Sequence, residues 1–302
     1  LFSHAGRTAT QHEDRQYPEN WFPFAFATSN DAMTGKTGSL FLGADNNPLV
    51  ISTNTSTEYW QKGASLLTTD PAGTRDLDDH SKARTYFITG TQHVGNFNTP
   101  SSPGSCAMPR NPHDAYPAIR ALLVALDEWI STGKAPPPSR VPRVSDGTLV
   151  EPLPQGRVGF PDIPGAYYNG RLHEGDLLDF GPQFDKGILT QLPPKLVGTP
   201  YPALVPNVDA DGHDMAGVRT VDIEVPVATF TGWALRAGFS AGEGCDASGQ
   251  QIDFPVTKAE RLTKGDPRPS LEERYPTHDD YVQKVTAAAR RLERDRLLLP
   301  ED

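Results

Sequence analysis

The sequence lacks the features of a disulfide-rich, membrane-spanning or nucleic-acid-binding protein. It has two cysteines, Cys106 and Cys245, too few for a disulfide framework, although one bridge between them stays open. The longest apolar runs, such as IRALLVAL at 119–126, are far shorter than the roughly 20 residues that cross a bilayer. The net charge is −10 and basic residues form no cluster, which argues against nucleic acid and anionic membranes as partners. We expect a soluble protein of open localisation, and a Cys106–Cys245 bridge would favour export.

The start of the chain lacks the usual features of a natural N-terminus. It reads LFSHAGRTAT, with neither an initiator methionine nor a basic-then-apolar signal sequence. This start predicts a processed or truncated end. What the chain has in excess is proline, with 29 residues in 302, close to twice the usual frequency of about 5%. A chain of this length can bury a large core, and the prolines predict short elements joined by ordered loops.

Hydrophobic patterns predict alternating strands and helices in the first half. The segments are a strand at 48–54, a helix at 56–67, a strand at 83–90 and a helix at 118–134. The first helix should be capped by Ser56 or Thr57, and the second should stop at Gly133.

A proline-rich connector predicts the main boundary of the chain. APPPSRVPRV at 135–144 holds three consecutive prolines, which exclude a helix. We therefore expect two parts. Residues 1–135 form the first, and residues 136–302 form an extension with short strands and a helix from about Thr277, where aspartates in the first turn and late arginines suit the helix dipole.

Two acid–base residues follow the two predicted strands. Glu58 comes directly after the first strand, and His93 lies in GTQHVGN, directly after the second. In an α/β-hydrolase the triad acid follows one strand near the end of the sheet and the histidine follows the next. The order predicts Glu58 as triad acid and His93 as general base, although a plain surface-loop histidine is the alternative at this position.

The chain offers no obvious nucleophile in the required place. The fold's order is serine, acid, histidine, yet no serine before Glu58 sits in a glycine-flanked strand-to-helix turn. The only formal match is Ser240 in GFSAG at 238–242, and the glycine-rich stretch EGCDASGQ after it suits no helix. We expect the serine to lie upstream of this chain, and Ser240 is a minor alternative.

Long mixed motifs carry a family resemblance. They are QHEDRQYP, STEYWQKGASL, FITGTQHVGN, ALLVALDEWISTGKAPPPSRVP, LVPNVDADGHDMAGVR, VPVATFTGWALRAGF and GDPRPSLEERY. Together they resemble the family of large bacterial α/β-hydrolase domain proteins over nearly the whole chain.

The resemblance implies that the chain corresponds to the C-terminal part of a longer protein. Glu58 is again implied as triad acid and His93 as base. The serine, the oxyanion-hole amides and most of the sheet would lie outside the chain. Since the two strands would then expose an unpaired edge, we expect a companion polypeptide or a longer native chain.

Other candidate sites receive structural interpretations. DADGHD at 209–214 has its glycine fourth rather than sixth, so it fits a hairpin turn better than a calcium loop. His12, Glu13 and Asp14, with His4 nearby, are a minor metal candidate, and we expect no metal site. Trp60 and Trp233 are candidates for a substrate pocket, although aromatic side chains more commonly pack in a core.

The sequence therefore predicts an α/β fold that is the C-terminal portion of a hydrolase core plus an extension. The predicted function is hydrolysis of a small carboxylic ester through a Ser-His-Glu triad without a cofactor, inactive without the missing half. The alternatives are a non-catalytic binding or assembly module, or an esterase that uses Ser240.

Overall fold

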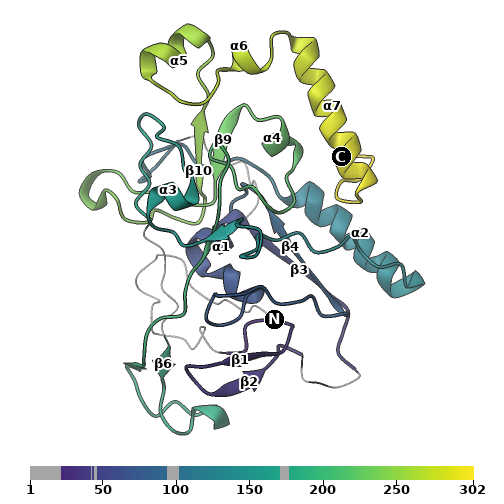
Figure 1. Ribbon diagram of the computed structural model, residues 1–302, viewed down its shortest axis with the longest axis vertical. Helices are drawn as coiled ribbons and strands as arrows, with labels where there is room; N and C mark the ends of the chain where they lie inside the picture. The colour runs from purple at the N-terminus through teal and green to yellow at the C-terminus, as the bar shows by residue number, and fades with distance from the viewer. Residues whose placement is uncertain (1–21, 42, 44–45, 94–101, 171–176) are drawn as a thin grey trace.

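The fold is described from a computed structural model, which covers residues 22–41, 43, 46–93, 102–170 and 177–302 (Figure 1). The α-helices are α1 Ser56–Lys62, α2 Tyr116–Thr132, α3 Gln155–Val158, α4 Val221–Glu224, α5 Lys258–Lys264, α6 Leu271–Arg274 and α7 His278–Arg294. Three 3-10 turns are η1 Ala64–Leu67, η2 Phe184–Lys186 and η3 Gly238–Ser240. The strands are β1 Ser29–Asp31, β2 Lys36–Gly38, β3 Val50–Thr55, β4 Ala83–Ile88, β5 Leu149–Val150, β6 Leu178–Asp179, β7 Lys195–Leu196, β8 Val205–Pro206, β9 Ala228–Thr231 and β10 Gln250–Asp253.

One parallel strand pair lies at the centre of the molecule. β3 and β4 pair over their full length, from Val50↔Ala83 to Thr55↔Ile88, and α1 begins the connection between them (Figure 1). The other pairs, β1–β2, β5–β8, β6–β7 and β9–β10, are antiparallel. A strand, a helical crossover and a parallel strand make up the repeating unit of α/β folds, so the predicted fold class is confirmed.

One of the hydrophobic core clusters forms around β4 and α2. Tyr86 and Ile88 of β4 are fully buried, because aromatic and β-branched side chains suit a strand that is covered on both faces. The cluster consists of Tyr86, Ile88, Ala115, Ala118, Leu122, Val218, Leu292 and Leu297. The last two belong to α7 and the turn that follows it, and Figure 1 shows α7 on the same side of the molecule as α2. The C-terminal helix therefore completes the core of the first half.

Helix ends follow the predicted signals except at the two ends of α1. α1 begins after Thr55, which is its N-cap in place of the predicted Ser56 or Thr57, and it ends earlier than predicted, at Gly63, whose φ is 64°. The residues after Gly63 continue as η1. α2 stops at Gly133 with φ of 77°, as predicted, and α7 begins at N-cap Thr277. Glycine accepts this left-handed conformation without steric cost.

The second half of the chain packs against the central strands. The edge of β4 opposite β3 bonds to the connector and to a segment beyond it: Phe87 N–H donates to Arg140 O at 2.8 Å, and Val218 N–H donates to Phe87 O at 2.7 Å. The residues from 136 onward therefore extend the sheet that the first half begins. The division into 1–135 and 136–302 stays a prediction.

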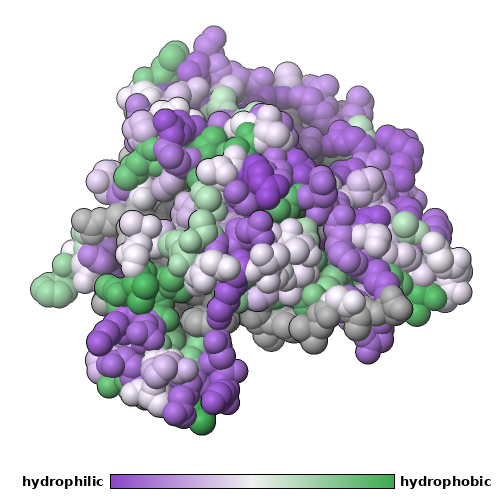
Figure 2. Space-filling model, turned by 60° about the horizontal axis from the view of Figure 1, so that its bottom comes forward, coloured by the Kyte–Doolittle hydropathy of each residue, from purple (hydrophilic) through white to green (hydrophobic). Residues whose placement is uncertain are grey.

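The surface is mixed in character. On the face shown in Figure 2 most residues are hydrophilic, and hydrophobic residues gather in several separate patches. Exposed apolar side chains include Ile188, Leu192 and Leu196 in the β6–β7 region. Across the part of the chain that the structure covers, every helix is too short or too polar to traverse a membrane.

Candidate active site

The carboxyl ends of β3 and β4 place the two predicted side chains at one edge. β3 ends at Thr55 and α1 follows at once, so Glu58 lies in the first turn of α1. β4 ends at Ile88, and Gly90, with φ of 68°, turns the chain toward His93. Because the strands are parallel, both ends lie at the same edge of the sheet. Glu58 and His93 therefore meet although they are 35 residues apart.

Glu58 binds His93 with one oxygen and its own helix N-terminus with the other. Its Oε1 pairs with His93 Nδ1, and its Oε2 accepts the Thr55 backbone N–H at 2.7 Å. The Thr55 hydroxyl also contacts Oε2. Glu58 is thus the third residue of a capping box, a role that fixes its rotamer. An ionised carboxylate only accepts, so Nδ1 donates and Nε2 carries the lone pair that a general base needs.

Lys62 lies against the same imidazole. Its Nζ is 3.2 Å from His93 Nδ1 and 3.1 Å from Nε2, and 3.9 Å from Glu58 Oε1. Since Cε1 stands between the two ring nitrogens, an atom almost equally close to both lies over the ring face rather than in line with either lone pair. Lys62 was not singled out by the sequence analysis. Its spacing of four residues from Glu58 on one helix is the signal that would have found it.

The environment keeps Glu58 ionised. Burial acts to raise the pKa of its carboxyl, but hydrogen bonds from His93 and Thr55 and the charges of His93 and Lys62 lower the pKa below its usual 4.5. The His93 side chain is 35% exposed and that of Glu58 13%. The carboxylate is therefore shielded, and the imidazole remains accessible to solvent.

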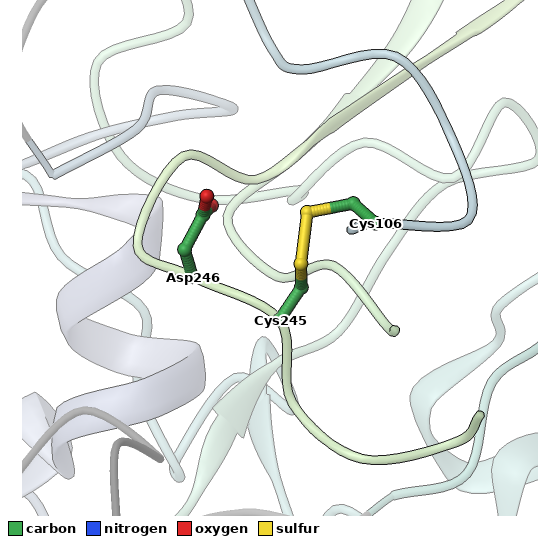
Figure 3. A group of neighbouring side chains, drawn as sticks. All are labelled: Cys106, Cys245 and Asp246. Atoms are coloured by element: carbon green, nitrogen blue, oxygen red, sulfur yellow. A yellow bond between two sulfur atoms is a disulfide. The ribbon is translucent and has the colours of Figure 1, made fainter. Parts of the chain in front are cut away.

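The second half of the chain forms the wall behind this pair. Ala247 O accepts the backbone N–H of His93 at 3.1 Å, and Gln61 Nε2 of α1 donates to Asp246 O at 3.2 Å. Directly before Asp246, Cys245 forms a disulfide with Cys106, with Cα atoms 5.5 Å apart (Figure 3). The bridge that the sequence left open is thus present, and it fastens the segment that holds His93.

Close backbone packing brings this wall onto α1. A Cβ added to Gly232 would lie 2.2 Å from the carbonyl carbon of Ser56 and 2.5 Å from Thr57 N. Real Cβ atoms do not approach backbone atoms so closely, so only glycine fits between this segment and the first turn of α1. The position of Glu58 therefore depends on a residue far along the sequence.

Trp60 and Trp233 lie in a common core. Their ring centroids are 6.1 Å apart, and both are buried in a cluster that includes Phe160 and Tyr168. The Trp60 Nε1–H donates to Asp214 Oδ1 at 2.9 Å. This placement favours packing for both rings, and a role in substrate binding stays a prediction.

Ser240 occupies a different setting from a nucleophile elbow. It ends the 3-10 turn η3, beside the fully exposed Phe239, and its carbonyl accepts Glu243 N–H at 3.1 Å. Among the described residues no hydrogen bond joins Ser240 to His93. This geometry gives no support to Ser240 as the partner of His93.

Two clusters of side chains that could ligate a metal lie among the described residues. The ligand atoms of Asp209, Asp211 and His213 lie within 4.8 Å of one another, but the two carboxylates pair with Arg219 and Arg274. The segment is a hairpin in which Val208 and Asp214 bridge, with Gly212 at φ of 83°, as predicted.

In the second cluster, Asp246 lies beside two cysteines whose sulfurs are used by the disulfide. The predicted minor candidates His4, His12, Glu13 and Asp14 lie outside the described residues.

The family comparison agrees with this geometry. The chain matches the alpha/beta hydrolase domain family over residues 3–302. It therefore belongs to that family, and the resemblance read from its motifs is confirmed. The class of protein is a hydrolase. No curated protein and no solved structure matches the chain.

Proposed function

We propose that the chain supplies the acid and the base of a serine hydrolase that acts on small carboxylic esters. The observation that carries the proposal is the hydrogen bond between Glu58 and His93 at the ends of two adjacent parallel strands. This arrangement fits a triad in which the carboxylate holds the imidazole tautomer and Nε2 takes a proton from the nucleophile. No cofactor is needed for this chemistry.

The proposed reaction runs in two steps. A serine hydroxyl attacks the ester carbonyl while Nε2 of His93 takes its proton. The tetrahedral intermediate then expels the alkoxide, which receives that proton from His93, and an acyl-serine remains. Water attacks the acyl-serine as His93 takes its proton, and the serine leaves with that proton as the acid is released. Glu58 stabilises the imidazolium that forms in each step.

We further propose that the serine comes from a companion polypeptide or a longer native chain. In this arrangement residues 1–135 are the C-terminal part of the hydrolase core, and residues 136–302 are a family-specific extension. Within the described segments β3 pairs only with β4, so its other edge is open to a further strand. An open edge of this kind is normally covered in native proteins, and that further strand would belong to the segment that carries the serine.

The test is the intact mass of the native protein before and after treatment with a fluorophosphonate, which modifies activated serines, followed by peptide mapping that locates any adduct. An adduct on a serine other than Ser240, lost in His93→Ala, is the expected result. An adduct on Ser240 would overturn the proposed triad. If no adduct forms, the chain is a binding or assembly module rather than part of an esterase.

A further inference from the structure

Asp214 is a buried carboxylate that bonds to the helix carrying Glu58 and to the loop leading to His93. Its side chain is 3% exposed. It lies at the end of the 209–214 hairpin, 158 residues after Ser56. None of the residues that the structure describes forms an ion pair with it. Burying a carboxylate without an ion pair costs free energy of folding. The position of Asp214 therefore suggests a role beyond packing, and its hydrogen-bond partners indicate which one.

Two of its three donors belong to α1. The Ser56 hydroxyl donates to Oδ2 at 2.5 Å, and the Trp60 indole N–H donates to Oδ1 at 2.9 Å. Ser56 and Trp60 are four residues apart and therefore share one face of the helix, with Glu58 between them in the sequence. Asp214 thus fixes the rotation of the short helix that presents the acid.

The third donor lies on the loop that carries the base. The Gly90 backbone N–H donates to Oδ2 at 3.2 Å, the same oxygen that accepts from Ser56. The carbonyl of Gly90 accepts from Asn111 Nδ2 at 2.8 Å and lies 3.0 Å from His113 Nδ1. A Cβ at Gly90 would lie 2.5 Å from Ile223 Cδ1. The peptide from which the chain turns toward His93 is therefore held from both sides.

We propose that Asp214 is a positioning residue, which sets the distance and orientation of Glu58 relative to His93 by tying α1 to the loop after β4. This inference rests on the proposed function. All three partners are donors, and two of them, the indole and the peptide N–H, cannot accept. Burial raises the pKa of Asp214, against the hydrogen bonds from Ser56, Trp60 and Gly90, which lower it.

Asp214→Asn is the sharpest variant, because it keeps the size of the side chain. If the amide oxygen faces Ser56 and Gly90, its NH₂ group meets the Trp60 indole N–H, and two donors collide. We expect kcat of the native enzyme to fall by about 100-fold, the usual cost of misplacing a catalytic group by about 1 Å, with KM little changed. Adding Trp60→Phe removes the opposing donor and should restore part of kcat.

The matched control is Asp211→Asn in the same hairpin. Asp211 pairs with Arg274 on α6 and contacts neither α1 nor Gly90, so kcat should stay within about two-fold of the wild type. Should Asp214→Asn not fold, Ser56→Ala removes a single donor and should still lower kcat without raising KM. An unchanged kcat in the folded variants overturns the proposal.

A spectroscopic readout separates this proposal from the proposed function. The Nδ1 proton of a histidine bonded to a carboxylate gives a downfield proton resonance, and His93→Ala identifies it by its loss. This signal should disappear or shift in Asp214→Asn and persist in Asp211→Asn. If the native protein neither hydrolyses esters nor reacts with a fluorophosphonate, the proposed function fails. The Nδ1 proton signal then tests by itself whether Asp214 positions Glu58 relative to His93. A signal unchanged in Asp214→Asn overturns the positioning role.

Discussion

β3 and β4 have the same length and a shared register, yet they differ in environment. β4 is buried along most of its length and bonds at both edges, to β3 on one side and to Arg140 and Val218 on the other. β3 is only half-buried and, within the described ranges, has a strand partner on one edge alone. His93 thus follows a strand that is bonded at both edges, whereas Glu58 follows a strand with a partner on one edge among the described residues.

The largest contrast concerns the two residues that follow these strands. His93→Ala in the native enzyme should lower kcat on the order of a million-fold, because the general base is lost. Glu58→Gln should lower it by about 10⁴-fold, because the base remains but its tautomer is no longer fixed. Ester hydrolysis measured at saturating substrate tests both. A loss of less than about tenfold in His93→Ala would contradict the assignment.

A second contrast concerns stability. Ile88→Ala in β4 should cost about 2–5 kcal/mol, because the side chain is fully buried in the core cluster around β4 and α2. Ile51→Ala in β3 should cost about 1 kcal/mol, since Ile51 is only partly buried. Urea denaturation of the chain measures both values. Equal losses would mean that β3 is as well covered as β4, as a companion strand in the native protein would achieve.

The disulfide stabilises the segment next to His93, which follows β4. Cys106 and Cys245 close a loop with a sequence separation of 139, which constrains the unfolded chain strongly. Replacing both cysteines by serine should lower the free energy of unfolding by about 2–4 kcal/mol. A thiol reductant should have a similar effect on the wild type and none on the double variant. Unfolding curves that coincide for the two proteins would contradict this expectation.

The smallest expected effect is the loss of the stability contribution of Glu58 at acidic pH. The pKa of Glu58 is lowered from 4.5 in the folded state, so its contribution to stability is full above that pH and is lost as the pH falls through the folded pKa. The stability advantage of the wild type over Glu58→Gln should therefore shrink below pH 4.5. Lys62→Met should reproduce only part of this change, because the Lys62 charge is the last of several causes. An advantage that does not vary with pH would show that Glu58 titrates normally.

Local patterns in the sequence predicted the elements that carry the site. The order of β3, α1 and β4 and the residues Glu58 and His93 follow from hydrophobic runs and chain order, because each depends on neighbours within a few residues. The N-cap was misplaced by one residue, since Ser56, Thr57 and Thr55 all have side chains suited to capping. The actual cap is decided by the capping box that Thr55 forms with Glu58.

The residues that support the site could not be predicted in the same way. Asp214 lies in a hairpin whose own sequence explains its turn, and nothing in that segment indicates contacts with Ser56 or Gly90. Nothing in the sequence around Gly232 indicates its close approach to α1. Such contacts depend on tertiary packing between distant segments, which no local pattern encodes.

The separation of these contacts along the chain has a consequence for folding order. Glu58 and His93 are 35 residues apart, whereas Asp214 is 158 residues from Ser56 and 124 from Gly90. During synthesis, contacts between nearby residues can form first, and those that close long loops follow. During synthesis, Glu58 and His93 can therefore meet well before Asp214 has left the ribosome. The pair forms first, and the carboxylate that we propose to orient it arrives later.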